Sequence, residues 1–208
     1  ILKSSSFLIA VTTFLSMITI FFIKKYEWWL IGGIFFSNLI LIRYLVLFID
    51  SKFSKKYINK GSALAHVGFA LLILSVSLNS ALSTEKTYSM SVNDVVDFNE
   101  YQIKFDRVSI ETSSNFESLS ADFIFENENS SFKLFPEKRR YFVRGEITTE
   151  SAISIKPLKD IYITIGEQQS NGKWIVNIQE NYFVRLIWFS AIIMSLGTIL
   201  VIRQKIYV

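Results

Sequence analysis

The sequence predicts an α + β membrane protein. It would have about four transmembrane helices and a small all-β domain, a barrel or a sandwich, between the third and the fourth. Half of the 208 residues are hydrophobic, including 19 Phe, and they fall in long runs that are not typical of a soluble domain. Between the third and fourth runs lies a charged region of about 100 residues in which apolar and polar residues alternate. These two observations predict the fold class.

Four apolar runs are long enough to span the hydrocarbon core of a bilayer, which takes about 20 helical residues. They cover residues 7–23, 28–49, 61–82 and 182–202. Residues 1–82 are therefore expected to hold three transmembrane helices, and residues 182–208 the last helix and a tail. The first run is not interpreted as a signal peptide, because it is long, lacks a small-x-small cleavage site and is followed at once by a second span.

The basic residues of the short loops indicate the orientation of the helices. Most of them lie on one side, in the loop between the second and third spans and in the C-terminal tail: Lys52, Lys55, Lys56, Lys60, Arg203 and Lys205. Lys24 and Lys25, in the first hairpin, fall on the opposite side and are outnumbered. We expect the basic side to be the cytoplasm or the mitochondrial matrix. The membrane would then be a bacterial or mitochondrial inner membrane, and residues 83–181 would lie in the periplasm or intermembrane space.

The distribution of charge argues against a nucleic-acid partner. Residues 83–181 contain 16 acidic and 11 basic residues, whereas the rest of the chain contains 11 basic and 2 acidic residues. The net charge of +4 therefore comes from the membrane part, where it reflects topology.

Residues 83–181 show the period-two alternation of half-buried β-strands. Apolar residues alternate with polar ones in five segments, at residues 101–105, 123–125, 132–134, 161–165 and 174–178. Asn171-Gly172 is a turn signal before the last of them, and residues 126–131 are expected to form an exposed loop. Six or seven short strands in about 100 residues suggest a small barrel or sandwich.

Most familiar catalytic chemistries lack their residues here. The sequence has no Cys, so it carries no CxxCH haem-attachment motif and forms no disulfides. It also lacks Walker A and HExxH patterns. With a single His in the chain, no Ser/His/Asp triad can be argued from the sequence. No catalytic residue can be assigned from the sequence, and any active site would be unusual or shared with another chain.

The single histidine, His66, lies about six residues, or roughly 9 Å, into the third span from Lys60. An ionisable side chain at that depth in a membrane is a candidate functional residue. Ser62 and Ala70 lie four residues to either side on the same helix face, which would let a flat partner or another helix approach. Neutral imidazole is a common axial ligand of haem iron. His66 is therefore either a metal ligand, to haem iron, or a side chain hydrogen-bonded to a neighbouring helix.

Arg43 in the second span is predicted to lie at a similar depth to His66, because the two spans run in opposite directions and Arg43 is about 10 Å from Asp50 by helical rise. A guanidinium there could pair with a carboxylate such as a haem propionate. Alternatively, Arg43 could extend to the lipid headgroups.

Several short motifs follow one another from Gly61 to the C-terminus. They are Ala63-Leu64-Ala65-His66-Val67-Gly68, Glu137-Lys138-Arg139-Arg140-Tyr141, Thr149-Glu150-Ser151-Ala152-Ile153, Asp160-Ile161-Tyr162, Gly166-Glu167 and Phe183-Val184-Arg185-Leu186-Ile187-Trp188. Together they resemble the C-terminal part of the CcmF family, membrane proteins of cytochrome c maturation related to the NrfE and CcsA haem-handling proteins. The chain departs from the family pattern at Asn181-Tyr182, where Lys-Pro is usual.

The resemblance implies that His66 is an axial ligand of a haem b between the spans. The second axial ligand would come from an earlier span, in the missing N-terminal part or another subunit. The haem b would reduce haem received from a haem chaperone, and the haem lyase complex would attach that haem to CxxCH of apocytochrome c, with thiol-reducing maturation subunits as further partners. The chain begins at Ile1, so we expect a processed product or a fragment whose activity needs the missing part.

The same resemblance places Lys138, Arg139 and Arg140 on or near a strand edge, where they could contact a partner subunit or the apocytochrome. The alternative is a charged, solvated strand end. A second function also stays open at this point, a non-catalytic membrane scaffold whose β domain docks cytochrome c assembly partners.

Overall fold

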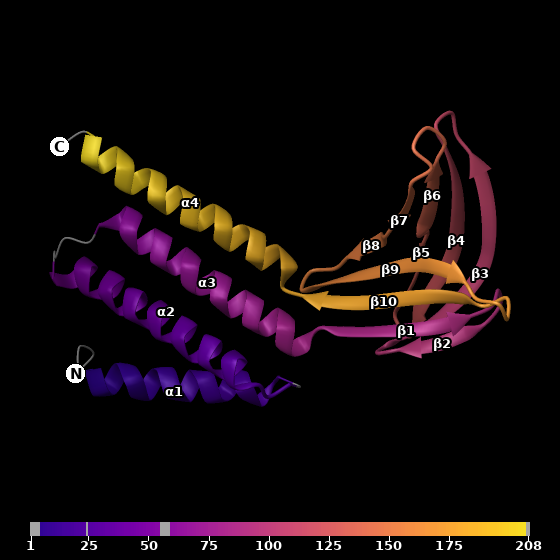
Figure 1. The fold of residues 1–208 in the computed structure, drawn as a ribbon. Helices are drawn as coiled ribbons and strands as arrows, with labels where there is room; N and C mark the ends of the chain where they lie inside the picture. The colour runs from indigo at the N-terminus through magenta and orange to yellow at the C-terminus, as the bar shows by residue number, and fades with distance from the viewer. Residues whose placement is uncertain (1–4, 24, 55–58, 207–208) are drawn as a thin grey trace. The chain divides into compact units, whose positions relative to one another are not determined.

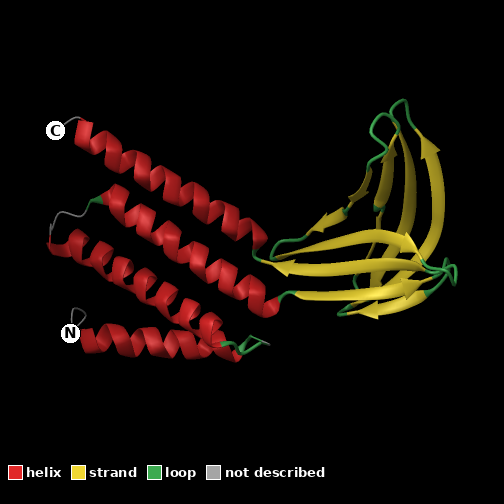
Figure 2. Cartoon of the chain, viewed as in Figure 1, coloured by secondary structure: helices red, strands yellow, loops and turns green. Residues whose placement is uncertain are grey.

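The computed structural model describes residues 5–23, 25–54 and 59–206, and the chain divides into two compact units. One unit is a bundle of helices that come before and after the strands in the sequence. The other unit, Ser83–Asn181, consists of the strands. Figures 1 and 2 show the helical unit and the β unit. Lys24, Lys55 and Lys56, which the orientation argument uses, lie outside the described residues.

The helical unit contains α1 (Ser5–Phe21), α2 (Trp28–Ser54), α3 (Lys60–Leu82) and α4 (Val184–Ile206). Within the described residues, three of them are long and apolar enough to cross a membrane, over Trp28–Ile49, Lys60–Leu82 and Val184–Arg203. The predicted first span is a helix of 17 residues, at the lower limit of about 17 residues for a transmembrane helix. The structure thus has four helices in the predicted regions, three of which are long and apolar enough to span a membrane, and α2 extends five residues beyond its predicted end.

Small residues let α3 and α4 pack closely. A Cβ on Gly68 would lie 2.7 Å from the backbone nitrogen of Met194, and a Cβ on Gly61 would lie 2.7 Å from that of Val201. Gly197 of α4 in turn faces the backbone of Ala65. This stripe of small residues brings the two backbones into contact, as in other membrane helix pairs.

This packing predicts a position-specific effect of adding one methyl group. Gly68→Ala should destabilise the bundle by about 1–3 kcal/mol, because the new Cβ meets backbone that cannot move aside without separating α3 from α4. Gly32→Ala is the matched control, since nothing lies within 4 Å of a Cβ at that position. The check is the midpoint of helix loss on heating in detergent. Equal midpoints for the two variants would contradict the packing.

The ends of α3 and the start of α4 are held by side chains. The Asn59 side-chain oxygen accepts a hydrogen bond from the Ser62 backbone N–H at 3.0 Å, which caps the N-terminus of α3. Near the other end of α3, the Asn79 amide donates to the backbone carbonyl of Tyr182 at 2.6 Å. Phe183, the next residue, has a φ of 59°, and this left-handed residue makes the turn between the last strand and α4.

The β unit is a sandwich of two sheets. One sheet has the order β1-β10-β9-β8, and the other β2-β3-β4-β6-β7, with β5 also paired to β4. Consecutive strands pair antiparallel within each sheet. The strands are β1 (Thr84–Met90), β2 (Val95–Phe98), β3 (Tyr101–Thr112), β4 (Phe116–Asn127), β5 (Ser130–Leu134), β6 (Glu137–Tyr141), β7 (Ile147–Glu150), β8 (Ala152–Ile155), β9 (Lys159–Gln168) and β10 (Trp174–Tyr182).

The alternating residues identified in the sequence form the core of this sandwich. Ile161, Ile163 and Ile165 of β9 are fully buried. In the other sheet, the rings of Phe105 of β3 and Phe123 of β4 stack with centroids 4.5 Å apart. Burial of large aliphatic and aromatic side chains from both sheets supplies the main stabilisation of the unit.

The described residues form ten strands, more than the six or seven predicted. The additional strands are short or polar, and β6 with the sequence Glu-Lys-Arg-Arg-Tyr is the clearest case. These segments are strands because their backbones pair with neighbouring strands, and their own side-chain pattern does not show the alternation of a half-buried strand. The loop expected over residues 126–131 is also shorter than predicted, because β4 continues to Asn127 and β5 begins at Ser130.

Candidate functional site

His66 lies in the first half of α3 with its side chain exposed on the surface of the described chain. Its Nδ1 lies 2.7 Å from the backbone carbonyl oxygen of Ser62. A carbonyl oxygen can only accept a hydrogen bond, so Nδ1 carries the proton and donates it. In the neutral imidazole, Nε2 then keeps its lone pair, which is the state that a metal ligand requires.

The position of the imidazole is also set by Tyr44 of α2. The two rings stack with centroids 5.0 Å apart and an angle of 29° between their planes. This contact holds the ring against α2 on one side. It shows that residue 44 of α2 is level with residue 66 of α3, which agrees with the depth estimated from helical rise. Tyr44 was missed in the sequence, where only the antiparallel pairing of the two spans could have indicated it.

The helix face predicted around His66 is not uniform. Ala70 is fully buried in the bundle, whereas His66 is exposed and Ser62 is half-buried. Gly61 and Gly68 are buried against α4. Most of the small residues of α3 therefore serve helix packing, and His66 is the polar group of this segment that remains open to a partner.

Arg43 directly precedes Tyr44 and its side chain is exposed. Within the part of the chain that the structure describes, it has no hydrogen bond or ion pair. The stacking of Tyr44 on His66 places Arg43 within one residue of the level of the imidazole. A carboxylate bound beside His66 would therefore find a guanidinium at the same depth.

The three basic residues of β6 do not form one surface. The Lys138 side chain pairs with Glu167 of β9, while the Arg139 side chain pairs with Glu137 at 2.9 Å and lies over the Phe116 ring. Arg140 is exposed. As residues i and i+2 of the strand, Lys138 and Arg140 share one face, and Arg139 lies on the opposite face. β6 pairs with both β4 and β7, so these residues lie one strand in from the edge of the sheet, which β7 forms.

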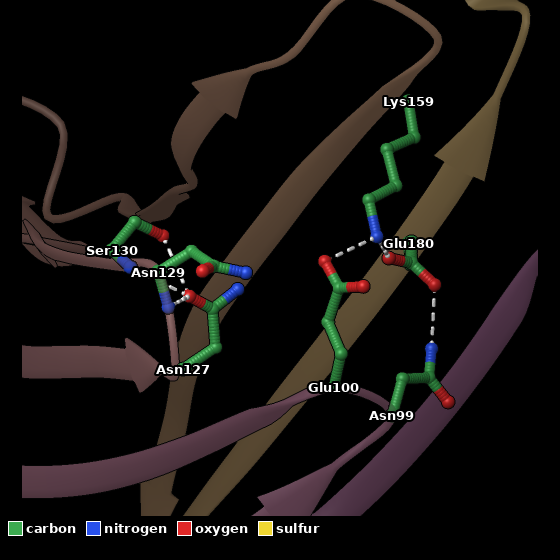
Figure 3. Close-up of polar contacts among 7 residues, drawn as sticks. All are labelled: Asn99, Glu100, Asn127, Asn129, Ser130, Lys159 and Glu180. Carbon is green, nitrogen blue, oxygen red and sulfur yellow. Dashed lines mark hydrogen bonds and ion pairs between the residues drawn. The ribbon is translucent and has the colours of Figure 1, made fainter.

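A polar cluster around one buried carboxylate, that of Glu180, closes one end of the sandwich core, and the sequence did not indicate it (Figure 3). The Lys159 ammonium pairs with Glu180, whose side chain is 3% exposed, and with Glu100 at 2.9 Å. The Asn99 amide donates to the second oxygen of Glu180 at 2.6 Å. These residues come from the β2–β3 turn and the facing ends of β9 and β10, so the cluster ties both sheets together.

Tyr101 extends this cluster into the core. Burial and a hydrogen bond to Glu100 raise the pKa of the Tyr101 hydroxyl to about 12, and Lys159 lies 5.4 Å from the centre of its ring. Tyr101 therefore stays protonated at physiological pH and donates to the Glu100 carboxylate. Hydrogen bonds from Lys159 and Tyr101 in turn lower the pKa of Glu100.

The chain offers few metal ligands. Among the described residues, no group of three or more His, Cys, Asp or Glu side chains converges as a metal site. An iron bound in a macrocycle needs only one or two protein ligands. His66 is the side chain of this chain that could provide one of them.

Comparisons with known proteins place the chain among proteins of cytochrome c biogenesis. Residues 81–181 match the family model described as the CcmF C-terminal β-sandwich. The chain is 32% identical over 148 residues to the cytochrome c-type biogenesis protein CcmF of Pseudomonas aeruginosa and to that of Escherichia coli. These matches cover 71% of this chain but only 22% and 23% of the relatives, so the chain spans less than a quarter of their length.

A solved structure also shares the fold. The cytochrome c haem lyase CcmF superposes with a TM-score of 0.76 at 10% identity, covering 96% of this chain and 34% of that protein. At that identity the superposition speaks for the fold alone.

Proposed function

The chain belongs to the CcmF family, and from this premise we propose that it forms the C-terminal part of a membrane haem lyase for cytochrome c maturation. The whole complex would receive haem from a haem chaperone and attach it to the CxxCH motif of apocytochrome c. The similarity to cytochrome c-type biogenesis proteins over 71% of the chain supports this function.

The observation that carries the proposal is the state of His66. Its Nδ1–H is committed to the Ser62 carbonyl, its ring is held by Tyr44, and its Nε2 is the atom left for a ligand bond. These features fit an axial ligand of haem b, and Arg43 would pair with a propionate at the same depth. When bound, that haem would supply the electron that reduces the incoming haem iron.

The second axial ligand would come from residues outside this chain. The exposed side of His66 is where such a partner would approach, because the buried faces of α3 are occupied by the other helices. The chain would thus provide half of a shared site. We assign no residue of this chain to the formation of the thioether bonds themselves.

We further propose that the membrane is a bacterial inner membrane and that residues 83–181 lie in the periplasm. The relatives reported above come from bacteria, and three described helices suit a membrane. The described basic residues Lys52, near the end of α2, and Lys60, at the start of α3, lie at the ends of these helices away from Leu82, where the chain continues into the β strands, which supports this orientation.

The function can be tested in a bacterium whose CcmF protein lacks its C-terminal part. Supplying this chain should restore covalent holocytochrome c, measured by haem staining of denatured protein on a gel. A chain without residues 83–181 is the control. If the intact chain is inserted in the membrane and assembled with the truncated protein but restores no holocytochrome c, the proposal fails.

The scaffold function is favoured by one observation, an exposed apolar turn between β6 and β7. Val143 in this turn is 92% exposed, and Phe142 and Ile147 are also exposed. Arg140 precedes these residues and Arg144 lies between Val143 and Ile147, so the turn would suit an assembly partner with an apolar and acidic surface, such as a thiol-reducing maturation subunit. A purified complex that holds partners through this turn but contains no haem b would favour the scaffold over the haem site.

A further inference from the structure

A second exposed apolar feature lies at the turn between β8 and β9. Ile155 and Leu158 in this turn are 66% and 64% exposed. Lys156 lies between them, with its ammonium 4.2 Å from the centre of the Phe132 ring. The turn is closed by a hydrogen bond from the Lys156 N–H to the Lys159 carbonyl at 2.9 Å. A fixed turn with two outward aliphatic side chains and a cation is typical of a surface that meets lipid.

The place of this turn in the β unit suggests which surface it meets. Leu158 directly precedes Lys159, whose ammonium is bound to Glu180 near the end of β10. Figure 1 shows the β8–β9 turn beside that end of β10. Glu180 is also paired with Thr84, near the start of β1. The turn therefore lies at the end of the sandwich where the chain enters and leaves the unit.

Both connections from this end to the transmembrane helices are short. Thr84 is two residues from Leu82, where α3 ends, and this segment spans at most about 7 Å. Glu180 is four residues from Val184, where α4 begins, which allows at most about 14 Å. Both connections to the transmembrane helices therefore start from the end of the sandwich that carries the turn.

We propose that Ile155 and Leu158 insert into the headgroup region of the same bilayer, with Lys156 at the level of the lipid phosphates. The lipid contact would limit how the β unit moves above the membrane, and it goes beyond the proposed haem chemistry. It depends on the membrane placement of α3 and α4 and not on His66, so its failure would leave the haem proposal intact.

The apolar β6–β7 turn provides an internal comparison. Lys138 of β6 contacts Glu167, which is eight residues along β9 from Lys159 and therefore about 26 Å away. Figure 1 shows the β6–β7 turn, which contains Val143, well away from the β8–β9 turn and from the end of β10. Two equally apolar turns are thus expected to have different surroundings in a membrane.

The test uses the absence of Cys from the chain, because a cysteine introduced at one position takes a single label. The variants Leu158→Cys, Ile155→Cys and Val143→Cys of the full chain are labelled with the fluorophore NBD. They are reconstituted in vesicles of phosphatidylethanolamine and phosphatidylglycerol. Labels at 158 and 155 should show blue-shifted emission and several-fold stronger quenching by headgroup-proximal nitroxide lipid than the label at 143, which should be quenched by aqueous iodide.

Circular dichroism on each labelled variant confirms that the strands are intact, and two positions are used so that one misfolded variant does not decide the test. Equal quenching of labels at 143 and 158 by iodide would overturn the proposal. So would labels at 155 and 158 that are shielded from iodide but not quenched by nitroxide lipid, because that result would indicate protein contact.

Discussion

Replacing His66 by alanine is expected to abolish the b-type haem absorbance of the assembled complex. The chain has one histidine, so no neighbouring imidazole of this chain can take over the iron. The alanine variant also keeps the helix, because Ala has the highest helix propensity and the His66 ring is exposed on α3. The measurement is the reduced-minus-oxidised spectrum of the purified complex, normalised to the amount of this chain.

Tyr44→Leu is the matched control for this experiment. It removes the ring stacked on His66 but leaves the proposed iron ligand in place, and aromatic pairs contribute about 0.5–1.5 kcal/mol. We therefore expect at most about tenfold weaker haem retention, with unchanged band positions. Full haem absorbance in the alanine variant would mean that His66 does not bind iron.

Replacing Lys159 by methionine is expected to destabilise the β unit by about 3–5 kcal/mol, the usual cost of breaking a buried ion pair from one side. The Lys159 and Glu180 side chains are 17% and 3% exposed, so the remaining carboxylate could not be solvated without opening the core. Glu100 would lose its link to β9 at the same time, whereas Asn99 would still donate to Glu180 of β10 (Figure 3). The measurement is urea unfolding of the full chain in detergent, followed through the β signal in circular dichroism.

Lys104→Met provides the control, because Lys104 pairs with Asp106 at 3.5 Å on the exposed surface, where such a pair contributes less than about 1 kcal/mol.

The effect of pH offers a second check. The lowered pKa of Glu100 stabilises the folded unit above the carboxyl's ordinary pKa, and this contribution is lost as the pH falls through the folded-state value. The Lys159→Met variant should lose less stability on acidification, and equal stability of both lysine variants would contradict the account.

The helices and the core strands could be predicted because their signals are local. An apolar run of 20 residues has few alternatives to a membrane helix, and the alternation at Ile161, Ile163 and Ile165 fits only a strand with one buried face. The structure confirms both, and it decides between a barrel and a sandwich in favour of the sandwich.

The remaining strands and the polar cluster could not be predicted because they depend on partners far away in sequence. The charged β6 is a strand only because β4 and β7 lie on its two sides. Lys159 and Glu100 are 59 residues apart, and nothing near either residue in the sequence marks the two as partners. The role of Tyr44 likewise depends on which residue of α3 lies opposite it.

The central claim is that the Nε2 of His66 binds haem iron, and the His66→Met variant tests it most directly. A thioether in place of an imidazole keeps an axial ligand but changes its chemistry, and His/Met ligation raises the reduction potential of haem. We predict a complex that retains haem with a more positive potential and an altered low-spin spectrum. A haem b whose potential and spectrum are the same in the methionine variant as in the unsubstituted protein would contradict the account.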